Sequence, residues 1–212
     1  MITPPARGRA SGSGPFLSRS PGREGFSIVG LVLTMAVAAT VLGLAAPGLA
    51  NLQSSVSVRS AAGEVGSAFY RARSLAITQS RNVGLKFLRN GDRYEWTIYA
   101  DGNGNGVRTA DIASGVDRPI ARFTWTHQDV HPSILQGIRV PDPGGSGFLN
   151  RIDDPIRFNG SDICSFSPIG ESTPGSVYLS DGRDRMAVVR VFGRTAKMRT
   201  LYYRRGERIW KP

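Results

Sequence analysis

The feature that most constrains this chain is an uncharged apolar run near its start. Residues 26–46 form 21 consecutive positions without an ionisable side chain, about the ~20 that a helix needs to cross a bilayer. The preceding residues, 1–25, are rich in Gly, Pro and Ser and contain four arginines against one glutamate. Because positive charge marks the cytoplasmic side of a membrane span, we expect a single-pass transmembrane helix over 26–46, with residues 1–25 in the cytoplasm and the remainder outside it.

The helix is predicted to continue beyond this run. Apolar residues form one stripe at steps of three and four, which begins with Leu49, Leu52 and Val56 and ends at Ala76. This is the spacing of an amphipathic helix. Pro47 removes one backbone donor and is expected to kink the helix without ending it. We therefore expect one helix over 26–81, whose first half lies in lipid and whose second half packs on a folded domain.

After Asn82 the apolar pattern changes to a period of two, which is typical of strands. Val83, Leu85 and Phe87 fall on one face, "RNGD" is a hairpin signal, and "YEWTIY" returns antiparallel. Further predicted strands are "IARFTWT", "ILQGIRV", "PIRFNG", "SVYLS", "MAVVRVF" and "KMRTLYYR". The predicted fold is α+β: a long N-terminal helix packed on a mainly antiparallel β-sheet domain over residues 82–212.

Two sets of motifs carry a family resemblance. Gly25 followed by Phe26, the apolar helix, and Pro47 as the 22nd residue from that Phe resemble a class III prepilin signal and the N-terminal helix of type IV pilins. The stretches "FYRARSLAITQSRNVGLKF" and "YADGNGNGVRTAD" are similar to the GspH/FimT group of minor pseudopilins. The motifs that carry the resemblance cover residues 22–50 and 69–111, and we recognise no further motif beyond Pro119.

The resemblance implies a structural subunit of a type II secretion pseudopilus or a type IV pilus. A prepilin peptidase would cleave between Gly25 and Phe26 and methylate the new amine of Phe26. The implied partners are other pilin or pseudopilin subunits, the prepilin peptidase, the inner-membrane assembly platform and the membrane itself. The implied location is the bacterial inner membrane, with the C-terminal domain in the periplasm or outside the cell, before extraction into a filament.

The sequence departs from this family at Gly30. A glutamate usually occupies that place, five residues into the mature chain, where its partner in an apolar environment would be the N-terminal amine of a neighbouring subunit. Gly30 cannot form that pair. One interpretation is a subunit that occupies a rare position in assembly, such as the tip or an initiating complex, and the other is sequence drift in a poorly functional copy.

Two alternatives for the N-terminal region stay open. "GLA" before Asn51 satisfies the small-x-small rule, so a secretory signal peptide could end at Ala50. The 21-residue run is longer than the ~7–15 residues of a typical signal-peptide core, and the amphipathic continuation favours a retained helix. The second alternative is a simple membrane anchor.

A calcium site is suggested by Asp101, Asn103 and Asn105, which precede Gly106 as in the first half of an EF-hand loop. However, the twelfth position is Ile112, where that loop needs a glutamate. We therefore favour a glycine-rich turn and expect no cofactor, with calcium as the alternative.

The chain's charge of +11 is concentrated at the C-terminus, where residues 183–212 contain ten basic and two acidic residues. FimT-type pilin-like proteins are associated with DNA capture, so the resemblance implies an alternative function as a DNA-binding pilin-like protein in DNA uptake. Phosphates attract basic side chains and bases stack on aromatic rings. A competing interpretation is that strand alternation leaves the arginines facing solvent or anionic lipid. The candidate nucleic-acid-binding residues are Arg194, Lys197, Arg199, Arg204, Arg205, Arg208 and Lys211.

Catalytic chemistry has little support in the sequence. His127 and His131 lack the glutamate of a zinc-protease helix and are followed by Pro132, so both are predicted to be loop or surface residues. Cys164 is the only cysteine and has no identifiable base partner. We expect the protein not to be an enzyme.

Overall fold

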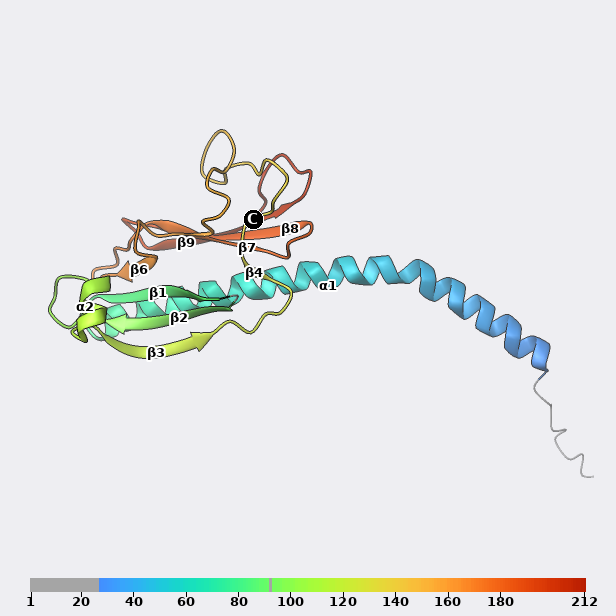
Figure 1. Ribbon diagram of the computed structural model, residues 1–212, viewed down its shortest axis with the longest axis horizontal. Coiled ribbons are helices and arrows are strands. Elements are labelled where there is room, and N and C mark those ends of the chain that lie inside the picture. Colours follow the sequence, from blue (N-terminus) through green and yellow to red (C-terminus); the bar gives the residue numbers. More distant parts are fainter. Residues whose placement is uncertain (1–26, 92) are drawn as a thin grey trace, which may run out of the picture. The chain divides into compact units, whose positions relative to one another are not determined.

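The computed structural model describes residues 27–91 and 93–212 (Figure 1). Its longest element is α1 (Ile28–Thr78), and strands with one short helix follow it. The α+β class with antiparallel strands is therefore confirmed. The later elements are β1 (Val83–Asn90), β2 (Arg93–Ala100), α2 (Thr109–Ser114), β3 (Arg118–Thr124), β4 (His131–Pro132), β5 (Ile156–Arg157), β6 (Ile163–Phe166), β7 (Gly175–Ser180), β8 (Arg185–Phe192) and β9 (Lys197–Arg204).

Helix α1 runs through the boundary between two compact units, which falls between Ala45 and Ala46. In the first unit the large apolar side chains are exposed, from Ile28 at 79% to Leu44 at 78%. Among the described residues, no helix combines the length and mean hydropathy required of a membrane span. Phe26 lies outside the described residues, as does the side chain of Pro47, where a kink is expected.

In the second unit, α1 contributes one face to the main hydrophobic core. The predicted stripe is confirmed from Val58 onward, but Leu52 and Val56 are each 65% exposed. Their inclusion in the packed stripe was wrong, because the core that α1 shares with the sheets begins at Val58. The buried helix residues are Val58, Ala61, Ala62, Val65, Ala68, Phe69, Ala72 and Ala76.

Two antiparallel sheets form the β domain, and both contribute to the core that α1 enters (Figure 1). The first has the order β3-β2-β1-β6, and the second β4-β7-β8-β9, with β5 also pairing with β7. The predicted β1–β2 hairpin is confirmed, since Asn90 lies opposite Arg93 and the turn between them contains Gly91 at φ 61°. A positive φ is readily adopted only by glycine.

Part of the outer face of the second sheet, around Met186, Val188 and Leu201, is covered by a loop that the sequence pattern wrongly predicts to be a strand. Ile134, Leu135 and Val140 are buried against this sheet, but residues 134–140 are not a strand, and Gly137 turns the backbone at φ 73°. Their apolar spacing therefore reflects burial against the sheet and not membership of it. The predicted strand "PIRFNG" is reduced to the two-residue β5, and β6 is a short strand that the sequence did not reveal.

Candidate functional site

The predicted processing site lies at the beginning of the mature helix. Gly25 and Phe26 are outside the described residues, so cleavage and methylation stay predictions. Gly30 is exposed in the first turn of α1, and a Cβ atom at this position would meet no atom within 4 Å. The described part of the chain therefore leaves room for a glutamate side chain at position 30.

A cluster of phenyl rings fixes the second half of α1 on the sheets. Phe69 is fully buried, and its ring centre lies 5.7 Å from that of Phe158, 6.0 Å from that of Phe87 and 6.3 Å from that of Phe166. Rings at these separations add to the stability that burial alone provides. One helix residue thus contacts β1, β6 and the chain just after β5.

Two polar contacts also join α1 to the β domain, and sequence analysis identified neither. The hydroxyl of Ser54 donates to Asp181, and Glu64 lies 2.8 Å from the ring nitrogen Nε2 of His127. The His127 side chain is only 19% exposed, so this loop residue is less accessible than the sequence suggested. Neither contact has a sequence signature, because the partners are far apart in the chain.

Asp181 also organises the turn between β7 and β8. One of its carboxylate oxygens accepts the backbone N–H groups of Arg183, Asp184 and Arg185 at 2.9–3.0 Å. Burial alone would raise the pKa of Asp181, but the hydrogen bonds from Ser54 and the three N–H groups outweigh it and lower that pKa.

The "DGNGNG" loop is built around the buried carboxylate of Asp101. It accepts the backbone N–H groups of Asn103 at 3.1 Å, Gly104 at 2.8 Å and Gly106 at 2.7 Å, and the Asn82 amide at 2.8 Å. Burial opposes ionisation, but these four donors outweigh it and lower the pKa of Asp101.

A second buried carboxylate, Asp117, closes the same loop from its other side. It accepts the backbone N–H groups of Gly102 at 3.0 Å and Arg108 at 2.9 Å. Gly102 must lack a side chain, because a Cβ atom there would collide with the carbonyl of Val116. Asp117 was not identified from the sequence, where it lies outside the glycine-rich motif.

These hydrogen bonds favour the turn interpretation of Asp101, Asn103 and Asn105. The Asp101 oxygens accept N–H groups, and the side-chain oxygen of Asn103 accepts the N–H of Asn105 at 3.2 Å. Across residues 27–91 and 93–212, no group of three or more His, Cys, Asp or Glu side chains is arranged to hold a metal ion. The calcium site stays a prediction.

The seven predicted nucleic-acid-binding residues are all exposed, but they do not form one surface. Lys197 and Arg199 lie on the outer face of the second sheet, whereas Arg204 faces the α1 side, as the strand register and core contacts require. Arg205 lies 3.8 Å from Asp184 and Lys211 lies 2.6 Å from Glu207, so both have an acidic partner. Arg194 and Arg208 lie outside the strands, before and after β9.

Comparison with known proteins gives one match. The family model described as type II transport protein GspH matches residues 61–193, which is more than half of the chain. The chain belongs to the GspH family. Membership supports a structural, pilin-like role in type II secretion, in association with the membrane and other pseudopilins. No curated protein and no solved structure gives a significant match.

The GspH match begins within α1 and ends at Gly193, just after β8. It includes Phe69 and the loop held by Asp101 and Asp117, which are therefore part of the shared family region. All seven predicted nucleic-acid-binding residues lie beyond its end.

Proposed function

We propose that this GspH-family chain is a minor pseudopilin whose mature form begins at Phe26. In this proposal residues 26–46 span the inner membrane, the β domain lies outside the cytoplasm, and the helix later enters a pseudopilus. The observation that carries the proposal is the change of surroundings along α1. Its side chains are exposed from Ile28 to Leu44, and one face is buried in the domain core from Val58 onward.

The physical argument concerns the uncharged first part of α1. Large exposed apolar surfaces mark contact with a membrane or a protein. A helix satisfies its own backbone hydrogen bonds and can therefore exchange lipid for neighbouring helices. The hydroxyls of Thr34 and Thr40 also have partners within the helix. They donate hydrogen bonds to the backbone carbonyls of Leu31 and Ala36, each at 2.8 Å. Small residues, including Gly30 and Gly43, would allow a close approach between helices.

Mass spectrometry of the N-terminus tests this proposal. The full-length chain is expressed in the bacterial envelope with an active or an inactive prepilin peptidase. We expect an N-methylated Phe26 only with the active enzyme. A Gly25→Val variant should stay uncut because the resemblance places Gly25 at the cleaved bond, whereas Gly22→Val should be processed normally. An uncut chain, or a mature chain beginning at Asn51, would contradict the proposal.

A second candidate function is DNA binding by the outer face of the second sheet. Arg190 lies directly opposite Arg199 on this face, and its guanidinium carbon lies 5.5 Å from the ring centre of Phe192. The Phe192 side chain is 39% exposed and Lys197 is its strand partner. Neighbouring basic side chains can bind phosphate groups, and an accessible aromatic ring beside them can stack on a base.

A gel-shift assay at two salt concentrations tests DNA binding. We expect the full-length chain to bind DNA more weakly at the higher salt concentration. The Lys197→Gln/Arg199→Gln variant should bind more weakly than the wild type, whereas Arg118→Gln/Arg122→Gln, with the same loss of charge on β3, should bind normally. Salt-insensitive or absent binding, or an equal loss in both variants, would exclude this site.

A further inference from the structure

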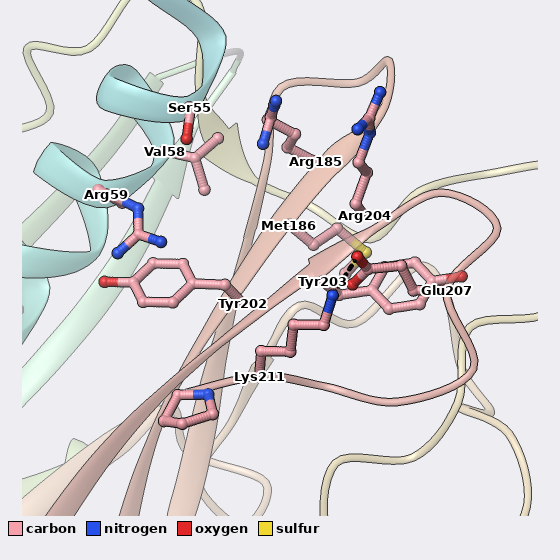
Figure 2. Close-up of a pocket in the computed structure, with 11 residues that line it drawn as sticks. Ser55, Val58, Arg59, Arg185, Met186, Tyr202, Tyr203, Arg204, Glu207 and Lys211 are labelled. Atoms are coloured by element: carbon pink, nitrogen blue, oxygen red, sulfur yellow. Dashed lines mark hydrogen bonds and ion pairs between the residues drawn. The ribbon is translucent and has the colours of Figure 1, made fainter. Parts of the chain in front are cut away.

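A cavity of about 290 Å³ lies between α1 and one end of the second sheet (Figure 2). All of its lining residues belong to the second compact unit. Helix α1 contributes Ser55, Val58 and Arg59, and the ends of β8 and β9 contribute two more arginines, Arg185 and Arg204. The segment after β9 supplies the remaining wall, which includes Glu207 and Lys211.

The three arginines of this pocket share the same side of the sheet. Arg185 and Arg204 are direct strand partners and lie on the face turned toward α1. From the helix, the Arg59 guanidinium carbon lies 4.4 Å from the ring centre of Tyr202. Like charges placed directly opposite on neighbouring strands destabilise a sheet, so an anion between them would remove an unfavourable interaction.

The nearby acidic side chains already have other partners. Asp181 receives Ser54 and three backbone N–H groups, Asp184 lies beside Arg205, and Glu207 binds Lys211. Within the described part of the chain, Arg59, Arg185 and Arg204 therefore form no ion pair. The three guanidinium groups are thus unpaired in the described part of the chain, although Glu207 and Pro212 also line the pocket.

The chemistry of the walls indicates which anion fits. Guanidinium groups bind carboxylates through two parallel hydrogen bonds. Val58 and Tyr202, which belong to the core on the α1 side of the sheet, add apolar and aromatic surface to the same pocket. A carboxylate on a short aliphatic stem uses both kinds of wall, whereas a free phosphate ion leaves the apolar wall uncovered.

We propose that this pocket binds a glutamate side chain presented by a partner protein. Arg185 and Arg204 hold the carboxylate, and the half-buried ring of Tyr202 contacts the aliphatic stem. Tyrosine and arginine are also among the residues enriched at protein interfaces. The inference rests on this pocket alone and does not depend on N-terminal processing.

Calorimetric titration of the full-length chain in uncharged detergent micelles tests the proposal. The probe is a hexaglutamate peptide, compared with inorganic phosphate and with short-chain phosphatidylglycerol. We expect the Arg185→Gln/Arg204→Gln variant to bind hexaglutamate at least about tenfold more weakly than the wild type, because two charge-assisted hydrogen-bonding groups are lost. The control Arg118→Gln/Arg122→Gln has the same net charge and should bind within about twofold of the wild type.

Thermal melts of the wild type and of one single variant provide a second measurement. Hexaglutamate should raise the Tm of the wild type, and Arg204→Gln should raise the Tm without peptide by removing the repulsion from Arg185. An equal loss of affinity in both double variants would show diffuse attraction only. Equally tight binding of phosphate, or binding of phosphatidylglycerol instead of the peptide, would overturn the assignment to a glutamate side chain, as would the absence of peptide binding.

Discussion

At the scale of single residues, three carboxylates hold the irregular parts of this chain. Asp101 and Asp117 bind the backbone of one loop, and Asp181 binds the β7–β8 turn together with Ser54 of α1. Each carboxylate accepts several backbone N–H groups that the loop cannot satisfy by regular pairing. The loops therefore depend on these carboxylate side chains as well as on glycines.

Replacing Asp101 should destabilise the domain. Asp101→Ala leaves three backbone N–H groups and the Asn82 amide without their acceptor, and we expect it to lower the free energy of unfolding by about 2–3 kcal/mol. The exposed Asp153 provides the control, and Asp153→Ala should change that free energy by no more than about 0.5 kcal/mol. Urea denaturation in detergent micelles measures both values. Equal effects would show that the Asp101 hydrogen bonds contribute little.

The same carboxylates predict a loss of stability in acid. The folded-state pKa values of Asp101 and Asp181 lie below the ordinary value, so their contribution is fully present above about pH 4 and is lost as the pH falls through the folded-state values. The free energy of unfolding should therefore fall as the pH is lowered from about 4 through the folded-state values. An Asp101→Asn/Asp181→Asn variant should show a shallower fall, and an unchanged slope would contradict this assignment.

At the scale of secondary-structure elements, α1 combines two environments in one helix. From Val58 onward its small residues bring the backbone close to both sheets, and Phe69 inserts between their aromatic side chains. Tyr70, the next residue, is 58% exposed because it points away from that core. The contribution of an α1 residue to packing on the domain therefore depends strongly on the helix face that it occupies.

Neighbouring substitutions on α1 test this packing. Phe69→Ala removes a fully buried ring, and we expect it to cost about 3–5 kcal/mol of unfolding free energy. Tyr70→Ala should cost less than about 1 kcal/mol. Chemical denaturation followed by the fluorescence of buried Trp96 measures the difference. Similar costs for the two variants would show that α1 does not dock through the face containing Phe69.

The sequence predicted the elements whose signals are local. Helix α1 is indicated by apolar residues three and four positions apart, and the β1–β2 hairpin by the "RNGD" turn between two alternating strands. Both signals come from residues that are close together in the sequence. It failed for residues 134–140, where contact with the second sheet produces an apolar pattern in a loop. It also missed Asp117, Asp181 and the arginine pocket, because these sites join residues that only the folded chain brings together.

At the scale of the whole molecule, the family match covers most of the core but neither end of the chain. Residues 61–193 contain the packed half of α1 and the strands from β1 to β8. The proposed membrane segment precedes this region, and most of the basic C-terminal residues follow it. At position 30, within the proposed membrane segment, the chain has a glycine where the resemblance implies a glutamate.

Restoring the acid at position 30 should change assembly. Gly30→Glu has open space around its Cβ position, and its carboxylate could pair with the N-terminal amine of a neighbouring subunit. We expect more copies of this chain per filament, counted by quantitative mass spectrometry of sheared filaments. Gly43→Glu, a matched charge at another open glycine of α1, should not increase the count. No increase with Gly30→Glu would show that the missing acid does not limit incorporation.

Recovery of the chain in sheared filaments tests the central claim most directly, since a pseudopilin must leave the membrane and join an assembly. We predict that the wild-type chain is present in the filament fraction when the prepilin peptidase is active, and stays in the membrane fraction with residues 1–25 attached when the peptidase is inactive. A chain absent from filaments under both conditions, or incorporated without processing, would contradict the account.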